Sequence, residues 1–289
     1  MYKSKKKIIF TFLFPSLLGL VVFKVGAMLY SLYISFTEWN LFGAPEFVGL
    51  KNYTDAFKNA DFILSLKNMF KMVVFSVLFH TPVALVMAAV INTKCKGYRV
   101  FKALFFVPTV FPLTAVGLMW YFVFMPTGVF NSFLEVIGLG GIAQAWLVNP
   151  STAMNTIVFV NIWAGVGYYM VILLAGLTTI SDDVYEAAAI DGANKLQCFF
   201  QITVPMLKPT IAMCILMDII GSVKVFDLVF AMTGGGPNGL TNLPTTLMYN
   251  EAFKYSHYGL GSAIGIIIMI ICLAGTLLSN KLTSRKNDQ

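Results

Sequence analysis

Six apolar segments, each long enough to cross a lipid bilayer, constrain this chain more than any other feature. An α-helix rises 1.5 Å per residue, so about 20 apolar residues span the hydrocarbon core of a membrane. The six segments are residues 8–36, 72–92, 103–125, 151–180, 210–232 and 259–280. Charged residues make up only 11% of the chain, against about 25% in soluble domains, so lipid must be the solvent for much of the surface. The pattern predicts an all-α membrane protein, in which a bundle of six transmembrane helices forms a single domain over residues 1–289.

The basic residues indicate which ends of these segments face the cytoplasm, because Lys and Arg are enriched in cytoplasmic loops. They cluster before the first segment, between the second and the third, and after the last. The clustered residues are Lys3, Lys5, Lys6, Lys7, Lys94, Lys96, Arg99, Lys102, Lys281, Arg285 and Lys286. The loop 126–150, on the opposite side, contains neither Lys nor Arg. Both termini are therefore predicted to be cytoplasmic. The first segment is expected to be a retained helix rather than a cleaved signal peptide, because its apolar run exceeds a signal core.

Composition and residue spacing argue against several functional classes. The net charge of +7 could suggest nucleic acid, but the basic residues flank apolar segments, so no nucleic-acid binding is expected. The four cysteines show no paired spacing, and the sequence predicts neither a disulfide framework nor a metal site. No Ser/His/Asp arrangement indicates catalysis. We therefore expect no enzyme.

Two loops between the segments are long enough to have structure of their own. The first outer loop, residues 37–71, is the longest, and it is predicted to contain a short helix near residues 53–59. The loop 181–209 is the largest segment predicted to lie in the cytoplasm. This size makes it the obvious place for a cytoplasmic partner to dock.

The loop 181–209 is predicted to form two short helices. Ser181 can cap the first, and Gly192 permits the left-handed turn that ends it. The second is expected to stop at Pro205 and Pro209, before the fifth apolar segment. Small alanines beside one carboxylate, at residues 186–188, suit a helix that fits closely into the groove of another protein. On residue chemistry alone, an ordinary capped loop between two spans explains the sequence equally well.

The spacing within this loop adds a further indication. Glu186-Ala187-Ala188 is followed after three residues by Gly192, and after nine more by Ile202, Val204 and Pro205. This arrangement resembles the EAA loop of permease subunits of ABC importers, with Val204 where leucine is usual. In that family the loop forms a coupling helix, which sits in a cleft of the ATPase subunit. The resemblance implies the fold of a type I ABC importer permease, and it assigns ATPase coupling to seven positions. They are Glu186, Ala187, Ala188, Asp191, Gly192, Ala193 and Pro205.

Several other segments resemble the sugar permeases of the maltose and glycerol-3-phosphate group. They are residues 47–53 (FVGLKNY), 191–193 (DGA), 225–227 with 233–237 (VFD and TGGGP), and 258–263 (YGLGSA). The resemblance implies import of a sugar or oligosaccharide across the cell membrane of a prokaryote by alternating access. It also implies the partners: a second homologous permease subunit, two ATPase subunits, an extracellular solute-binding protein and the sugar, in a setting of membrane lipid.

No cofactor is expected on this chain itself. The run from Gly234 to Gly236 is not followed by Lys-Ser or Lys-Thr, and the sequence contains no G-x-x-x-x-G-K-S/T motif. That motif is what cradles the phosphates of ATP. A glycine-rich turn at a helix end explains the run better. ATP and Mg²⁺ are therefore expected on the partner ATPase subunits.

Polar residues inside the fourth and fifth segments are the candidates for binding the substrate. A charge at mid-membrane costs about 2.5–3.5 kcal/mol, so it usually faces a cavity or a partner. Asn161, Gly165 and Tyr168 lie on one helical stripe at spacings of four and three residues. Asp218 and Ser222, four residues apart, can likewise project from one face. An amide, a glycine and an aromatic ring suit a sugar, and the corresponding stretches line the substrate pocket in maltose-type permeases.

Other ionisable residues leave alternatives open. Lys224 and Asp227 can pair on one helix face at a spacing of three residues, but an unpaired Lys224 would favour an anionic sugar. His80 is expected to be a hydrogen-bonded packing residue. Together with Asp218, these residues support one alternative function, an ion-coupled secondary transporter of a small polar solute.

Overall fold

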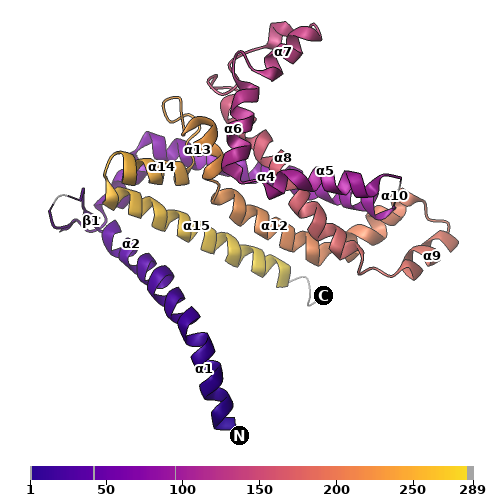
Figure 1. Ribbon diagram of the computed structural model, residues 1–289, viewed down its shortest axis with the longest axis horizontal. Coiled ribbons are helices and arrows are strands. Elements are labelled where there is room, and N and C mark those ends of the chain that lie inside the picture. Colours follow the sequence, from indigo (N-terminus) through magenta and orange to yellow (C-terminus); the bar gives the residue numbers. More distant parts are fainter. Residues whose placement is uncertain (1, 42, 95, 285–289) are drawn as a thin grey trace. The chain divides into compact units, whose positions relative to one another are not determined.

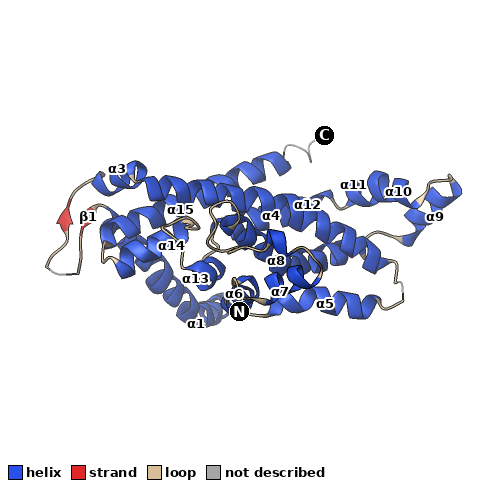
Figure 2. Ribbon diagram, turned by 90° about the horizontal axis from the view of Figure 1, so that it is seen from above, coloured by secondary structure: helices blue, strands red, loops and turns tan. Residues whose placement is uncertain are grey.

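The chain is predominantly helical (Figure 1). The computed structural model describes residues 2–41, 43–94 and 96–284, with the side chains of residues 10–277 within those ranges. One short two-stranded ribbon interrupts the helices of the described part, and Figure 2 shows it in red. Arg285 and Lys286, two of the basic residues that predict the orientation, lie outside the described residues. The chain divides into two compact units.

Five helical stretches of the described residues are long and apolar enough to cross a membrane. They are Phe10–Ser35, Ala60–Asn92, Leu113–Val136, Ala153–Leu177 and Tyr258–Leu277. A sixth crossing is present if Lys195–Met206 and Lys208–Val223, which are bent by 69°, form one span. The predicted helical class is confirmed, whereas the count of six depends on this bent pair.

The first compact unit comprises the residues up to Ile63 together with Leu247–Met269. Its N-terminal helix runs through α1 (Tyr2–Gly19), a π-helical stretch η1 (Leu20–Gly26) and α2 (Ala27–Ser35). The antiparallel strands β1 (Thr37–Glu38) and β2 (Glu46–Phe47) then lead to α3 (Lys51–Lys58). The unit also contains the π-helical stretch η4 (Asn250–Lys254) and the start of α15 (Tyr258–Ser284).

Contacts to the backbone of the ribbon hold this unit together. Asn52 Nδ2 donates to the backbone oxygen of Thr37 at 2.8 Å, and the Tyr258 N–H donates to the carbonyl of Trp39. Only glycine fits at Gly259, because a Cβ there would overlap the carbonyl oxygen of Thr37. The segments FVGLKNY and YGLGSA therefore meet at the same ribbon.

The second compact unit comprises Leu64–Thr246 and the residues from Ile270 onward. Its long helices are α4 (Ala60–Asn92), α5 (Tyr98–Val110), α6 (Leu113–Phe124), α8 (Ala153–Leu177) and α12 (Lys208–Val223). Shorter elements are α7 (Val129–Val136), η2 (Gly140–Ile142), α9 (Asp182–Ile190), α10 (Lys195–Cys198), η3 (Phe199–Thr203), α11 (Val204–Met206), α13 (Asp227–Thr233) and α14 (Pro244–Tyr249). A hydrophobic core forms where α4, α8 and α12 meet, and Ala88, Met170, Leu173 and Cys214 are buried in it.

Glycines set the distance between helices in the second unit. A Cβ on Gly167 of α8 would overlap the backbone carbonyl of Phe105 on α5. A Cβ on Gly117 of α6 would lie 2.8 Å from Ala231 Cβ on α13. Small residues allow such close approach of backbones, which gives membrane helices their van der Waals contact. Gly167 therefore brings α5 against α8, beside the candidate site.

The second helix begins earlier than its apolar run predicts. α4 starts at Ala60 rather than at residue 72, so the outer loop ends near Asn59 instead of Lys71. The predicted short helix is present as α3, over Lys51–Lys58. Hydropathy marks where a helix enters hydrocarbon, and polar turns of the same helix can continue into water beyond that point.

The third and fifth apolar segments are each interrupted. Between α5 and α6, Phe111 is extended, because Pro112 disfavours the helical conformation of the residue before it. α12 ends at Val223, and a new helix begins at Asp227. Lys224 and Asp227 thus lie on no common helix, and no ion pair joins them among the described side chains. The predicted pairing on one helix face is wrong.

Candidate functional site

A cavity of about 260 Å³ in the second unit brings together the residues that the sequence predicts to bind substrate. Its walls come from α4, α8 and α12 and from the break between α5 and α6. The predicted positions that line it are Asn161, Gly165, Tyr168, Asp218 and Ser222. The stripe on the fourth segment and the pair on the fifth therefore face one space.

Asp218 is the centre of the polar network in this cavity. Its side chain is buried, and its Oδ1 lies 2.9 Å from His80 Nδ1 and accepts a hydrogen bond from Ser222 Oγ at 3.3 Å. His80 Nε2 lies 3.2 Å from the backbone oxygen of Asn161. A carbonyl oxygen can only accept, so Nε2 carries a hydrogen. The pair is then either an imidazolium with a carboxylate or a neutral imidazole with a carboxylic acid. Its net charge is zero in both cases.

The second carboxylate oxygen of Asp218 has no hydrogen-bond partner. Oδ2 is shielded from solvent and makes no hydrogen bond to a described residue, although the Tyr169 hydroxyl also approaches this carboxylate. Leaving a buried polar group unpaired costs about 1–3 kcal/mol. A ligand hydroxyl could therefore satisfy Oδ2 only if a neighbouring side chain moved to uncover it.

The wall that α8 contributes depends on Asn161 and Gly165. Asn161 Nδ2 donates to Ser76 Oγ of α4 at 3.0 Å. A Cβ on Gly165 would lie 2.7 Å from His80 Nε2, so glycine is required for the observed position of the imidazole ring. His80 is hydrogen-bonded, as predicted, but it also lines the cavity. Ser76 accepts the hydrogen bond from Asn161. Neither His80 nor Ser76 was predicted to belong to the site, because their partners lie 138 and 85 positions away in the sequence.

Aromatic rings form the more open side of the cavity. The Tyr168 side chain is 43% exposed, and its ring packs edge-on against Tyr169 with centroids 5.3 Å apart. Tyr169 in turn lies 5.2 Å from the His80 ring. Phe111 and Leu113 reach the cavity from the break between α5 and α6. The Phe-Pro pair was a readable signal for that break, but not for its position beside α8.

The loop predicted to couple to an ATPase begins with α9. Ser181 Oγ accepts a hydrogen bond from the Asp183 N–H at 3.3 Å and caps the start of the helix. At the other end Gly192 has a φ of +81°, and the Ala193 N–H donates to the Ala188 carbonyl across the turn at 2.9 Å. This bond belongs to the Schellman motif, which requires a left-handed residue. Glycine at position 192 therefore fixes where α9 ends.

The second half of the loop ends between the two prolines that were predicted to stop it. Helical structure runs from Lys195 through Met206, and α12 begins at Lys208 after a bend of 69°. The break therefore falls between Pro205 and Pro209, as predicted. The chain bends at Leu207, whose side chain is buried in the core.

The loop is anchored on one side and uncovered on the other. Tyr185 Oη lies 3.0 Å from Thr203 Oγ1 and joins the two halves, and Phe199 packs against the core. Of the seven positions that the resemblance assigns to coupling, Ala188 is buried, Ala193 is half-buried and the others are exposed: Glu186, Ala187, Asp191, Gly192 and Pro205. Large apolar side chains are exposed beside them, namely Ile190 (87%), Leu196 (69%) and Phe200 (62%).

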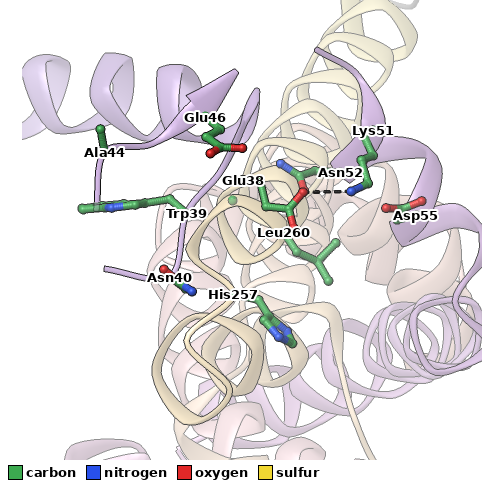
Figure 3. A pocket seen from close by; sticks show the side chains of 11 residues that line it. Glu38, Trp39, Asn40, Ala44, Glu46, Lys51, Asn52, Asp55, His257 and Leu260 are labelled. Carbon is green, nitrogen blue, oxygen red and sulfur yellow. Dashed lines mark hydrogen bonds and ion pairs between the residues drawn. The ribbon is translucent and has the colours of Figure 1, made fainter. Parts of the chain in front are cut away.

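The first unit contains a larger and more polar cavity, of about 510 Å³, which Figure 3 shows. Lys51 Nζ lies 2.8 Å from Glu38 Oε2 at its wall. The hydrogen bond and the charge of Lys51 lower the pKa of the Glu38 carboxyl below its ordinary value. Nearby, His257 Nδ1 lies 2.8 Å from Glu251 Oε2. No predicted substrate-binding or coupling residue lies in this cavity.

Comparison with known proteins places the chain among transport proteins. Residues 80–288 match the family described as binding-protein-dependent transport system inner membrane component. The probable ABC transporter permease protein YurN of Bacillus subtilis is 36% identical over 97% of both chains. The trehalose/maltose transport system permease protein MalF of Thermococcus litoralis is 31% identical over 98% of this chain and 95% of its own. The multiple sugar-binding transport system permease protein MsmF of Streptococcus mutans is 32% identical over 95% and 94%.

A solved structure shows the same fold. A chain of the bacterial alginate ABC transporter, crystallised with an alginate pentasaccharide-bound periplasmic protein, superposes with a TM-score of 0.85. The two chains are 24% identical over 99% of this chain and 97% of that chain. Together with the matched residues and the relatives, this similarity shows that the chain belongs to the inner membrane components of binding-protein-dependent transport systems, the permease subunits of ABC transporters.

Proposed function

We propose that this chain is the permease subunit of an ATP-driven importer, which moves a sugar or oligosaccharide by alternating access. Its family supports import that depends on a binding protein and a location in the cell membrane of a prokaryote. The printed names of the MalF and MsmF relatives support a carbohydrate as cargo. The partners are a second homologous permease subunit, two ATPase subunits that bind ATP and Mg²⁺, and an extracellular solute-binding protein.

In this proposal the chain crosses the membrane six times and forms one transmembrane domain over residues 1–289. Within the bent pair Lys195–Met206 and Lys208–Val223, the second helix provides the additional crossing and the first leads into it. The distribution of Lys and Arg places both termini in the cytoplasm. α9, α10 and α11 then lie on the side of the membrane where ATP is present.

Coupling follows from the two sides of the loop. The exposed Glu186, Ile190 and Leu196 contact a cleft of an ATPase subunit, while Tyr185 and Phe199 hold the loop to the core of α4, α8 and α12. Movement of the ATPase subunits thereby reaches α12, which carries Asp218. The exposed apolar side chains support this role, because an uncovered patch on a helix beside water indicates a protein partner.

The cavity around Asp218 binds the sugar, and the unpartnered Oδ2 is the observation that carries this part of the proposal. A sugar hydroxyl satisfies Oδ2 once a neighbouring side chain moves to uncover it, and the exposed ring of Tyr168 stacks on the apolar face of the sugar. Sites of this kind combine apolar walls with a few placed polar groups.

The charge of the cavity favours a neutral sugar over an anionic one. No Lys or Arg lines it, and Lys224 is absent from its wall. The net charge of the His80–Asp218 pair is zero, and both nitrogens of His80 are engaged within the chain. A carboxylate or phosphate would find no cationic partner here and would meet the unpaired oxygen of Asp218.

The test is to purify the importer with its binding protein and to identify the bound ligand by mass spectrometry. The expected ligand is an uncharged saccharide, and proteoliposomes of the complete importer should take it up only with ATP inside the compartment that the ATPase subunits face. A non-carbohydrate ligand would overturn the assignment of cargo, and a uronide would overturn the neutral charge.

The buried His80–Asp218 pair is the one observation that favours a second candidate function, an ion-coupled secondary transporter. That function requires uptake by this chain alone in liposomes under an ion gradient without ATP. Liposomes that contain this chain alone therefore distinguish the two functions, and we expect no uptake by them.

A further inference from the structure

An almost wholly apolar groove, separate from both cavities described above, lies where α4 ends and α5 begins. Its volume is about 270 Å³. Six of the side chains that line it are Val86, Val90, Ile91, Tyr98, Phe101 and Phe105. The side chains of Val86, Val90 and Phe101 are more than half exposed. The groove therefore offers an apolar channel that the described part of the chain does not fill.

Four cations stand at the end of this groove where α4 turns into α5. They are Lys94, Lys96, Arg99 and Lys102, and all four are exposed. The sequence has no Asp or Glu between Asp61 and Glu135. None of the four cations forms an ion pair with a described side chain. This end of the groove therefore carries positive charge without a counter-ion from its own helices.

Arg99 connects the charge to the groove. Its Nε donates to Tyr98 Oη at 3.2 Å, and its guanidinium lies 5.7 Å from the centroid of the Tyr98 ring. The Tyr98 ring is part of the groove wall. The guanidinium is thus held at the mouth of an apolar channel. A lipid whose acyl chain lay in this channel would have its phosphate close to the guanidinium.

We propose that this groove binds an anionic phospholipid. One acyl chain lies between α4 and α5, and the phosphate is bound by Arg99 with help from the neighbouring lysines. The proposal needs only that the chain lies in a membrane, and it does not depend on the cargo or on coupling to an ATPase. Basic pockets between membrane helices bind anionic headgroups in this way, and arginine binds phosphate through two parallel hydrogen bonds.

The polarity of the groove favours a lipid over an acidic protein segment. Its walls are mostly apolar side chains of α4 and α5, whereas the cations are confined to the loop and to the first turns of α5. An acidic peptide would leave its backbone polar groups unpaired between these walls. An acyl chain has no such groups.

The experiment is native mass spectrometry of the full-length chain, purified from membranes with its co-purifying subunits and titrated with phosphatidylglycerol or phosphatidylcholine of equal chain length. Phosphatidylglycerol should bind more tightly. The double variant Arg99→Gln/Lys102→Gln should lower that preference about tenfold. The matched control Lys58→Gln/Lys67→Gln removes the same charge far along the chain from the groove and should leave the preference unchanged.

Two further arms test the groove itself. Val90→Trp fills the channel without changing charge, and it should weaken binding of both lipids. Dihexanoyl phosphatidylglycerol and inorganic phosphate, which lack long chains, should compete poorly. Equal binding of the two lipids, an equal loss in the Lys58/Lys67 control, or full competition by inorganic phosphate would each overturn the proposal.

Discussion

The cavity around Asp218 and the loop around Glu186 belong to the same compact unit, yet their polar groups are satisfied in different ways. In the cavity, Asp218, His80 and Asn161 bond to one another or to α4 and α8, and one oxygen of Asp218 makes no hydrogen bond. In the loop, hydrogen bonds fix the shape of the backbone, while five of the seven residues assigned to coupling are exposed.

This difference separates stability from function. Changes in the cavity remove contacts that hold the fold together, so they should lower both thermal stability and uptake. In the proposed role the loop contacts another subunit, so changes in the loop should abolish uptake while the chain remains folded.

The largest effect on uptake is expected from Gly192→Pro. Proline fixes φ near −65°, whereas Gly192 has a φ of +81°, so the bond from Ala193 to Ala188 that ends α9 cannot form. ATP-dependent uptake and substrate-stimulated ATP hydrolysis should fall to background in proteoliposomes. The amount of chain in the membrane and its unfolding temperature should stay close to those of the unaltered protein.

A milder change at the same position should give an intermediate loss of uptake. Gly192→Ala can adopt the left-handed conformation at a cost of about 1–2 kcal/mol, and it should retain part of the uptake. Normal uptake by Gly192→Pro would contradict the coupling role. A fall in unfolding temperature as large as that of a cavity variant would remove the contrast between the two regions.

The largest effect on stability is expected from Asp218→Ala. Removing one partner of a buried ion pair typically costs about 3–5 kcal/mol, because the other partner is left unpaired. Uptake should be lost together with stability. The surface variant Asp182→Ala, on the loop, should change stability by less than about 0.5 kcal/mol.

A double-mutant cycle checks that this cost arises from the pair. The variants Asp218→Ala, His80→Ala and the combination should be non-additive in unfolding free energy, with a coupling of about 1–3 kcal/mol. Additive effects would show that His80 and Asp218 act independently, against the 2.9 Å contact between them.

A smaller loss of stability is expected from Gly167→Ala, which changes no polar group. The added Cβ would overlap the Phe105 carbonyl, so α5 must move away from α8. Overpacking of this kind costs about 1–3 kcal/mol, and the cavity that borders both helices should lose affinity for its ligand. Gly275→Ala in α15 is the control, because its Cβ would come no closer than 3.7 Å to Ile219 and it does not line the cavity.

The contrast also explains what the sequence could predict. The structure of the loop 181–209 could be predicted in part because its signals are local: Ser181 caps α9, and Gly192 ends that helix. The two stripes of the cavity were readable because helical periodicity places Asn161, Gly165 and Tyr168 on one face. Apolar runs likewise identified the spanning segments.

What the sequence did not predict depends on contacts between distant elements. The partner of His80 lies 138 residues away, and the side of the cavity formed by Phe111 depends on where α5 packs against α8. The end of α12 at Val223 was missed because hydropathy continues through Val225 and Phe226. The Val225 carbonyl, which no helix now satisfies, accepts a hydrogen bond from Thr245 instead. Such tertiary bonds leave no trace in a local pattern.

The smallest effect, and the sharpest test of the cavity as a sugar site, is expected at Tyr168. Its side chain is 43% exposed and makes no hydrogen bond to a described residue, so Tyr168→Ala should leave the unfolding temperature nearly unchanged. Loss of ring stacking should weaken transport affinity by about 0.5–1.5 kcal/mol, seen as a rise in KM of a few-fold to about tenfold. Tyr168→Phe keeps the ring and should retain the affinity of the unaltered chain.

A substitution at Tyr168 would then resemble a substitution in the loop, because it lowers uptake without lowering the unfolding temperature. The reason in this case is that the partner of Tyr168 is the substrate. Unchanged KM in Tyr168→Ala would place the sugar elsewhere.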